Sequence, residues 1–193
     1  AARRVLRSNS AAVARLRRTV LASNTAARTR MRERSTTRVF VTGAGVVSSL
    51  GLGREAFSRA LQEGRSGVAP VTYFDTEGIG RTLAAEVRDF RAKDHLTAAE
   101  AKRTGRCGAY CVAAARMALS DAGLTPERLG CERTAVVIGT TMGEADVISR
   151  LDGAWIRGGR EAVNDRMLPR YGNTLLPLHV ARAVPARGLV LTL

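Results

Sequence analysis

The chain has 193 residues, which is enough for one domain with its own hydrophobic core. Its net charge of +14 comes mostly from residues 1–38, which hold eleven Arg and one acidic residue, so bulk charge does not indicate a nucleic-acid-binding domain. No run of about 18 apolar residues occurs, which excludes a transmembrane helix, and three Cys are too few for a disulfide framework.

Residues 1–37 are rich in Arg, Ser, Thr and Ala and nearly free of acids. Apolar residues recur within this tail at helical spacing: Leu6, Val13, Leu16 and Val20. This combination is typical of an organellar transit peptide, and the alternatives are a disordered basic extension or a wrongly assigned start. Nucleic-acid binding is disfavoured because no aromatic residues are interleaved. We therefore expect a cytoplasmic protein, or a mitochondrial or plastid one if the tail is a transit peptide.

The first predicted strand is Val39–Thr42, a short apolar run of the kind that is buried on both faces of an α/β sheet. Gly43 and Gly45 follow it and permit a tight turn or a close backbone approach. They also begin a G-x-G-x-x-G dinucleotide-binding pattern, but Ser48 replaces the third glycine and Glu63 lies inside a helical segment. A Rossmann-type NAD(P) oxidoreductase therefore stays open as an alternative with an incomplete fingerprint.

The next part of the chain predicts two helices separated by irregular structure. A helix is predicted from Arg54 to Glu63, followed by loop-like residues 65–82 and a short edge strand at Leu83–Val87. Thr97 and Glu100 have the spacing of a capping box, which predicts a helix start at that point.

The strongest helical pattern runs from Lys102 to Ala122. Its predicted inner face is made of mostly small residues: Cys107, Gly108, Cys111, Ala115, Ala118, Leu119 and Ala122. Small side chains let backbones come close, so we expect this helix to lie between two layers. Cys107 and Cys111 are expected to be buried core residues rather than a metal pair, because no His or further Cys lies at ligand spacing.

The last third of the chain predicts two more buried strands. These are Arg133–Gly139 and Leu189–Leu193, and weak helical patterns occur at residues 145–156 and 161–168 between them. A short helix is also predicted after Thr125. The chain ends in a strand pattern and begins at Ala, so we expect both of its ends to be cut.

Three isolated side chains carry no expected chemistry. Cys131 lies in a predicted loop and is interpreted as an incidental thiol. His95 is expected to be a surface loop residue, and His179 is expected to pack or to cap a helix rather than to catalyse.

Two stretches resemble a single protein family. They are Arg38–Gly53 (Arg-Val-Phe-Val-Thr-Gly-Ala-Gly-Val-Val-Ser-Ser-Leu-Gly-Leu-Gly) and Leu61–Asp75 (Leu-Gln-Glu-Gly-Arg-Ser-Gly-Val-Ala-Pro-Val-Thr-Tyr-Phe-Asp). In this order they resemble the opening of β-ketoacyl-[acyl-carrier-protein] synthases, the condensing enzymes of fatty-acid and polyketide synthesis, which have the thiolase fold. The resemblance continues to Leu193 through Leu168–Pro169 and Asn173–Ala183.

The resemblance implies an α/β fold: the N-terminal half of a thiolase-like layered fold with a mixed, mostly parallel sheet. Residues 38–193 would form this incomplete synthase domain, and residues 1–37 would precede it as a basic tail. A nucleophilic Cys is expected just beyond Leu193, and two family His come later still. No catalytic residue is therefore expected within the chain, which alone is expected to be inactive.

The substrate-binding residues that the resemblance implies are Met142 and Gly143, because their counterparts form a gate at the acyl pocket. A Met can fold away to admit a chain, and the alternative is that Met142 simply fills the core. Glu144 departs from the usual Gly-rich loop and would be costly inside an apolar pocket unless it were paired.

The same resemblance implies the reaction and the partners. The parent protein is expected to be an acyltransferase that condenses an acyl thioester with malonyl-acyl carrier protein, with acyl carrier protein as its partner and a homodimer as its assembly. No cofactor, metal, nucleic acid or membrane is implied. The alternative is a non-condensing chain-length partner subunit whose nucleophilic Cys is replaced.

Overall fold

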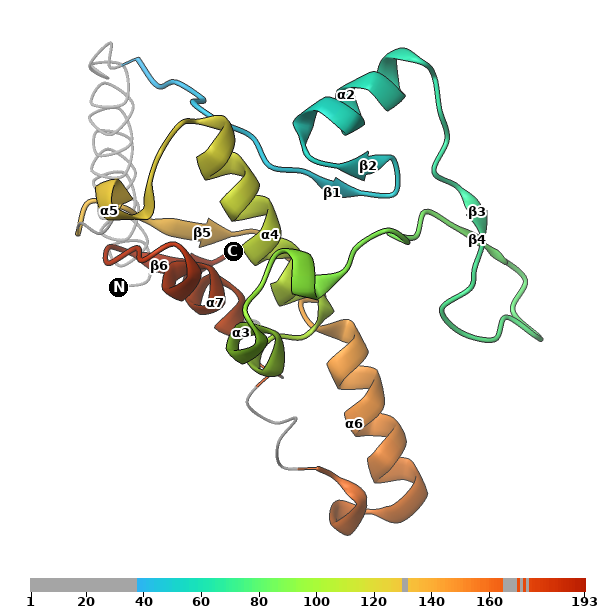
Figure 1. The fold of residues 1–193 in the computed structure, drawn as a ribbon. Coiled ribbons are helices and arrows are strands. Elements are labelled where there is room, and N and C mark those ends of the chain that lie inside the picture. The colour runs from blue at the N-terminus through green and yellow to red at the C-terminus, as the bar shows by residue number, and fades with distance from the viewer. Residues whose placement is uncertain (1–37, 130–131, 165–169, 171, 173) are drawn as a thin grey trace, which may run out of the picture. The chain divides into compact units, whose positions relative to one another are not determined.

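The structure is a computed structural model that describes residues 38–193 apart from 130–131, 165–169, 171 and 173. Residues 41–193 form one compact unit. Its helices (Figure 1) are α2 (Arg54–Gln62), α3 (Ala98–Arg103), α4 (Arg106–Asp121), α5 (Pro126–Leu129), α6 (Ala145–Gly158) and α7 (Leu175–Ala183), with 3₁₀ turns η1 (Ala92–Asp94) and η2 (Arg160–Ala162). Its strands are β1 (Val47–Ser48), β2 (Gly51–Leu52), β3 (Ala69–Pro70), β4 (Leu83–Ala84), β5 (Val136–Ile138) and β6 (Val190–Thr192).

The hydrophobic core lies where β5 and β6 meet α4 and α7. β5 and β6 pair in parallel, with Val136 opposite Val190 and Ile138 opposite Thr192. A parallel pair needs a long crossover connection, and here that connection contains α6 and α7. α7 packs against both strands and also against α4 (Figure 1). The buried residues of this core are Leu96, Ala109, Val112, Val136, Val180, Ala181 and Val184.

The fold is α/β, as predicted, and two of the predicted strands are confirmed. β5 lies inside the predicted strand Arg133–Gly139, and β6 lies inside Leu189–Leu193. The predicted edge strand Leu83–Val87 shortens to β4, which pairs antiparallel with β3. The prediction of a strand at Val39–Thr42 is wrong, because residues 38–46 contain no strand. A strand needs a ladder partner, and this segment has none among the described strands.

Gly43 and Gly45, which follow this segment, allow the close backbone approach that the sequence predicts. The chain at Gly43 and Gly45 lies directly against the backbone of α4. A Cβ atom on Gly43 would lie 2.7 Å from the backbone nitrogen of Ala122, and one on Gly45 would lie 2.8 Å from that of Ala118. Any side chain at either position would therefore push this segment away from the helix.

The buried face of α4 differs from the predicted one. The buried residues of the helix are Gly108, Ala109, Val112 and Ala113. Cys107 and Cys111 are only partly buried, which corrects the prediction that both are buried, although Cys111 does pack against the core. The helix is covered by α7 on one side and by the Gly43–Gly45 segment on another. Small residues therefore occur on several of its faces, and the sequence pattern does not show which face is the buried one.

The predicted capping box is confirmed at the start of α3. The Thr97 backbone N–H donates to the Glu100 carboxylate at 2.8 Å, and the Glu100 N–H donates to Thr97 Oγ1 at 3.3 Å. Glu100 also accepts from Arg116 on α4 at 2.7 Å. One carboxylate therefore starts α3 and joins it to α4.

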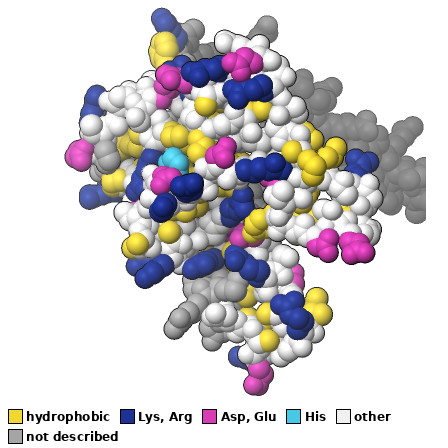
Figure 2. All heavy atoms as spheres, turned by 45° about the vertical axis from the view of Figure 1, so that its right-hand side comes forward, with side chains coloured by type: hydrophobic (Ala, Val, Ile, Leu, Met, Phe, Trp, Pro, Cys, Tyr) yellow, Lys and Arg dark blue, Asp and Glu magenta, His cyan; other side chains and the backbone are white. Residues whose placement is uncertain are grey.

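The surface of the described residues mixes charged and apolar side chains. Figure 2 shows basic, acidic and apolar groups side by side on one face. On the sheet, Val137 and Leu191 are 49% and 38% exposed, so the β5–β6 pair presents an apolar strip to solvent. No helix in the described part of the chain combines the length and the apolar character needed to cross a lipid bilayer.

Candidate functional site

The loop between β5 and α6 carries both residues that the sequence predicts to bind substrate. It runs from Gly139 to Glu144, and Gly143 turns it with a positive φ of 55°. The Gly143 N–H donates to Thr140 Oγ1 at 2.9 Å, which closes the turn. The Thr140 N–H donates to the Leu193 carbonyl at 3.1 Å, which ties the loop to the carboxyl end of β6.

Met142 lies near the tip of this loop and is 65% exposed. Among the described residues, Met142 is therefore not part of the hydrophobic core. The gating role of Met142 and Gly143 stays a prediction. What the structure adds is the position: the side chain is free to change rotamer beside the edge where β5 and β6 both end.

Glu144 is the one fully buried residue of the loop, with 1% of its surface exposed. Its carboxylate accepts three backbone N–H groups from the first turn of α4: Gly105 at 3.1 Å, Cys107 at 3.0 Å and Gly108 at 2.7 Å. The first N–H groups of a helix have no partner within the helix and carry partial positive charge. The predicted cost of burying this carboxylate is thus offset by three charge-assisted hydrogen bonds.

The start of α4 is shaped to receive that carboxylate. Its N-cap is Gly105, which offers no side-chain cap of its own. A Cβ on Gly105 would collide with Glu144 Oε2, and a Cβ on Gly108 would lie 2.8 Å from Glu144 Oε1. The absence of side chains at these two glycines therefore leaves space for the Glu144 side chain, which caps the helix from 39 residues further along the chain.

The protonation of Glu144 reflects two opposing effects. Burial raises the pKa of the Glu144 carboxyl above its ordinary value, and the negative charge of Asp146 acts in the same direction. The backbone N–H groups of Gly108, Cys107 and Gly105 stabilise the ionised form and limit the rise.

His179 packs close to the same helix end, as expected for a packed residue. It is half-buried on α7, and its Cδ2 atom would lie 3.5 Å from a Cβ on Gly108. Burial lowers the pKa of His179, and the positive charges of Arg182, Arg103 and Arg170 lower it further. Both effects favour the neutral imidazole.

His95 differs from its prediction as a plain surface residue. It is partly buried, and its ring stacks on Phe90 with centroids 5.2 Å apart and an interplanar angle of 9°. Its carbonyl accepts a hydrogen bond from Arg116. The residue fixes the turn before α3, and sequence spacing alone gave no signal of that stacking.

The two cysteines of α4, Cys107 and Cys111, form a hydrogen-bonded pair. The hydrogen bond raises the pKa of the Cys107 thiol strongly, and burial adds to the rise. The same hydrogen bond lowers the pKa of the Cys111 thiol, and burial opposes this effect. Cys107 is therefore the poorer nucleophile of the two. Among the described residues, no group of three or more His, Cys, Asp or Glu side chains is arranged to hold a metal ion. Cys131 lies outside the described residues.

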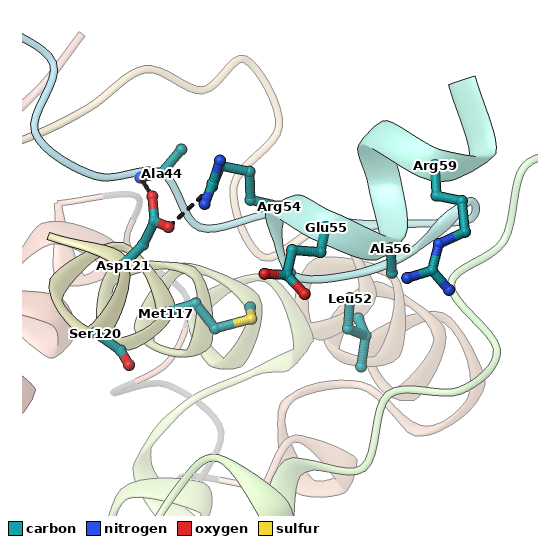
Figure 3. Close-up of a pocket in the computed structure, with 10 residues that line it drawn as sticks. Ala44, Leu52, Arg54, Glu55, Ala56, Arg59, Met117, Ser120 and Asp121 are labelled. Atoms are coloured by element: carbon teal, nitrogen blue, oxygen red, sulfur yellow. Dashed lines mark hydrogen bonds and ion pairs between the residues drawn. The ribbon is translucent and has the colours of Figure 1, made fainter. Parts of the chain in front are cut away.

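A hollow of about 420 Å³ lies between α2 and α4 (Figure 3). Arg54 and Arg59 from α2 line it together with Asp121 from α4. The Asp121 carboxylate accepts from the Ala44 N–H at 3.0 Å and from Arg54 Nε at 2.9 Å.

This hollow argues against the dinucleotide alternative. A phosphate-binding glycine turn leads directly into a helix whose free N–H groups face the ligand. Here the Gly43–Gly45 turn leads instead into the β1–β2 pair, and the Ala44 N–H already binds the Asp121 carboxylate. An anionic ligand would have to displace that acid.

Comparison with known proteins identifies the family. A family model described as "Beta-ketoacyl synthase, N-terminal domain" matches residues 36–193. The 3-oxoacyl-[acyl-carrier-protein] synthase 2 of Synechocystis sp. is 33% identical over 132 residues, which cover 68% of this chain and 32% of that protein. The actinorhodin polyketide putative beta-ketoacyl synthase 2 of Streptomyces coelicolor is 37% identical over 112 residues, which cover 58% of this chain and 28% of that protein.

The structural comparison agrees with the sequence comparison. The solved structure "The ishigamide ketosynthase/chain length factor" is 39% identical to this chain, with a TM-score of 0.73, and the match covers 79% of this chain and 38% of that one. The chain spans about a third of the length of the curated relatives that it matches. The family match covers most of the chain, and it therefore argues against the alternative that the protein is an NAD(P) oxidoreductase. The chain belongs to the β-ketoacyl synthase family, whose N-terminal domain it carries on a thiolase-like α/β fold.

Proposed function

We propose that the protein to which this chain belongs is a condensing enzyme that joins an acyl thioester to malonyl-acyl carrier protein. The observation that carries the proposal is the family match over residues 36–193, together with relatives named as 3-oxoacyl-[acyl-carrier-protein] synthases. Acyl carrier protein is accordingly the proposed partner, and a homodimer is the proposed assembly.

The geometry of β5 and β6 supports a place for this chemistry. Parallel strands end at one edge of their sheet, and ligands of α/β folds bind at the carboxyl ends of the strands. The loop with Met142 and Gly143 follows β5 and is bonded to Leu193 at the end of β6. A nucleophilic Cys just after Leu193 would therefore lie beside the proposed acyl gate.

The proposed reaction has two covalent steps. The thiolate attacks the carbonyl of the acyl thioester, and the carrier thiol leaves, so that the acyl group is bound to the enzyme. Malonyl-acyl carrier protein then loses CO₂, and its carbanion attacks the enzyme-bound acyl carbonyl and releases the thiolate. None of the described Cys is proposed as the nucleophile, because Cys107 and Cys111 lie in α4 and neither follows β6, where the nucleophile is expected. The chain of residues 1–193 on its own is accordingly proposed to be inactive.

A second candidate is a non-condensing partner subunit that sets chain length. The observation in its favour is the 39% identity to a solved structure described as a ketosynthase/chain length factor. This candidate keeps the acyl pocket with Met142 and Gly143 and replaces the nucleophile.

Incubation of the full-length protein with acyl- and labelled malonyl-acyl carrier protein tests the proposal. A condensing enzyme forms a β-ketoacyl product and an acyl-enzyme whose mass exceeds that of the free protein by the acyl group. If the folded full-length protein forms neither the β-ketoacyl product nor the acyl-enzyme, the condensing role is overturned. Product that appears only after a separate ketosynthase subunit is added supports the chain-length partner.

A further inference from the structure

The loop that carries Met142 and Gly143 is held at both ends by contacts with other elements of the fold, β6 and α4. At the start, the Thr140 N–H is bonded to the Leu193 carbonyl. At the end, the Glu144 carboxylate is bonded to three backbone N–H groups of α4. Only the residues between these two points are free to choose a conformation, and Gly143 is bonded back to Thr140.

The contact of Glu144 is specific rather than incidental. The carboxylate is 1% exposed and both of its oxygens accept, with Oε1 bound to Gly105 and Gly108 and Oε2 bound to Cys107. The carbonyl of Glu144 accepts from Val147 and Ile148, so the same residue starts α6. Glu144 therefore joins the first turns of two helices, and a change in its side chain is transmitted to the loop that precedes it.

We propose that Glu144 is a positioning residue for the acyl gate: its carboxylate, bound to the N-terminus of α4, fixes the backbone of residues 140–143 so that only the Met142 side chain can yield. The proposal rests on the proposed function for the acyl pocket and extends it to acyl-chain selection. A fixed backbone makes the gate narrow and selective, because a flexible side chain then has to fold away for each acyl chain. Release of Glu144 would let the whole loop move and would admit chains of more lengths.

Two variants of the full-length protein separate this role from a general effect of charge. Glu144→Gln keeps the shape but offers one acceptor oxygen, and its amide N–H₂ faces backbone donors. Asp146→Asn is the matched control, since Asp146 lies two residues on, in the first turn of α6, and its ion pair with Arg150 is on the surface.

Hydrogen exchange measures directly how firmly the backbone of the loop is held. We expect the backbone N–H groups of residues 140–147 to exchange about tenfold faster in Glu144→Gln than in the native protein, and about equally fast in Asp146→Asn. Equal exchange in all three proteins overturns the proposal, and so does an equal acceleration in both variants. If Glu144→Gln does not fold, Glu144→Asp keeps the charge with a side chain one methylene shorter, and the same comparison applies to it.

Steady-state kinetics with short-chain and long-chain acyl-acyl carrier proteins measures the selectivity for acyl-chain length. We expect the ratio of kcat/KM values for the two chain lengths to shift at least fivefold toward unity in Glu144→Gln, through KM, with kcat for the preferred chain changed less than twofold. An unchanged ratio, or a uniform loss of kcat, overturns the positioning role. If the native protein forms no β-ketoacyl product, it is the proposed function that fails, whereas the exchange rates still decide whether Glu144 holds the loop.

Discussion

Replacement of Glu144 by Ala should be among the most costly single changes in the described part of the chain. The carboxylate is 1% exposed and accepts three backbone N–H groups at 2.7–3.1 Å. Each buried donor left without a partner costs about 1–3 kcal/mol, and the change also removes a negative charge from a helix N-terminus. Relief of the burial cost of the carboxylate, and water entering the vacated space, offset part of this loss. We expect a net loss of about 3 kcal/mol in the free energy of unfolding.

Urea unfolding of the full-length protein, followed by circular dichroism, measures that loss at pH 7. The matched control is Asp146→Ala, whose surface ion pair with Arg150 at 2.7 Å should contribute less than about 1 kcal/mol. A cost for Glu144→Ala within about 0.5 kcal/mol of the control would refute the reasoning, because it would mean that the three hydrogen bonds only balance the burial of the charge.

The remaining predictions concern the same helix end, the core and the tail. Because the pKa of Glu144 is raised in the folded state, that state binds the proton more tightly, so the stability advantage of the native protein over Glu144→Gln should shrink as pH rises from about 4.5 through the folded pKa; urea titrations across pH 4–8 check the sign, and a growing advantage would contradict it. Gly108→Ala, whose Cβ would lie 2.8 Å from Glu144 Oε1, should cost about 1–3 kcal/mol, and the cost should shrink in the Glu144→Ala background if the clash is its source. Val112→Ala, at a site with no exposed surface, should cost about 2 kcal/mol in the same assay, and a neutral result would mean that this side chain is not core. For residues 1–37 fused to a fluorescent protein, we expect diffuse cytoplasmic fluorescence, and fluorescence confined to mitochondria or plastids would instead support the transit-peptide alternative.

The helices and the parallel strands could be predicted because their signals are local. The capping residues Thr97 and Glu100 are three positions apart, and the apolar runs of β5 and β6 are continuous in sequence. The segment Val39–Thr42 has the same apolar character, yet it forms no strand, since pairing depends on a partner and not on the run itself.

The candidate site shows the same limit more sharply. The sequence pointed to Met142 and Gly143 through a family resemblance, and it marked Glu144 only as a departure from the usual loop that would be costly to bury unless it were paired. Its partners, Gly105 and Gly108, stand 39 and 36 residues earlier in the chain, and nothing local connects them. The one available signal was the pair of glycines where a helix should start with a capping side chain.

The parallel pairing of β5 with β6 has a consequence for how the chain reaches its fold. Val136 cannot meet Val190 until α6 and α7, which lie between them in sequence, have been synthesised and folded back. Contacts of such long sequence separation form late and slow the folding of a domain. During synthesis on the ribosome, β5 and the apolar side of α4 are therefore expected to stay exposed until β6 has formed, and exposed apolar surface of this kind promotes aggregation.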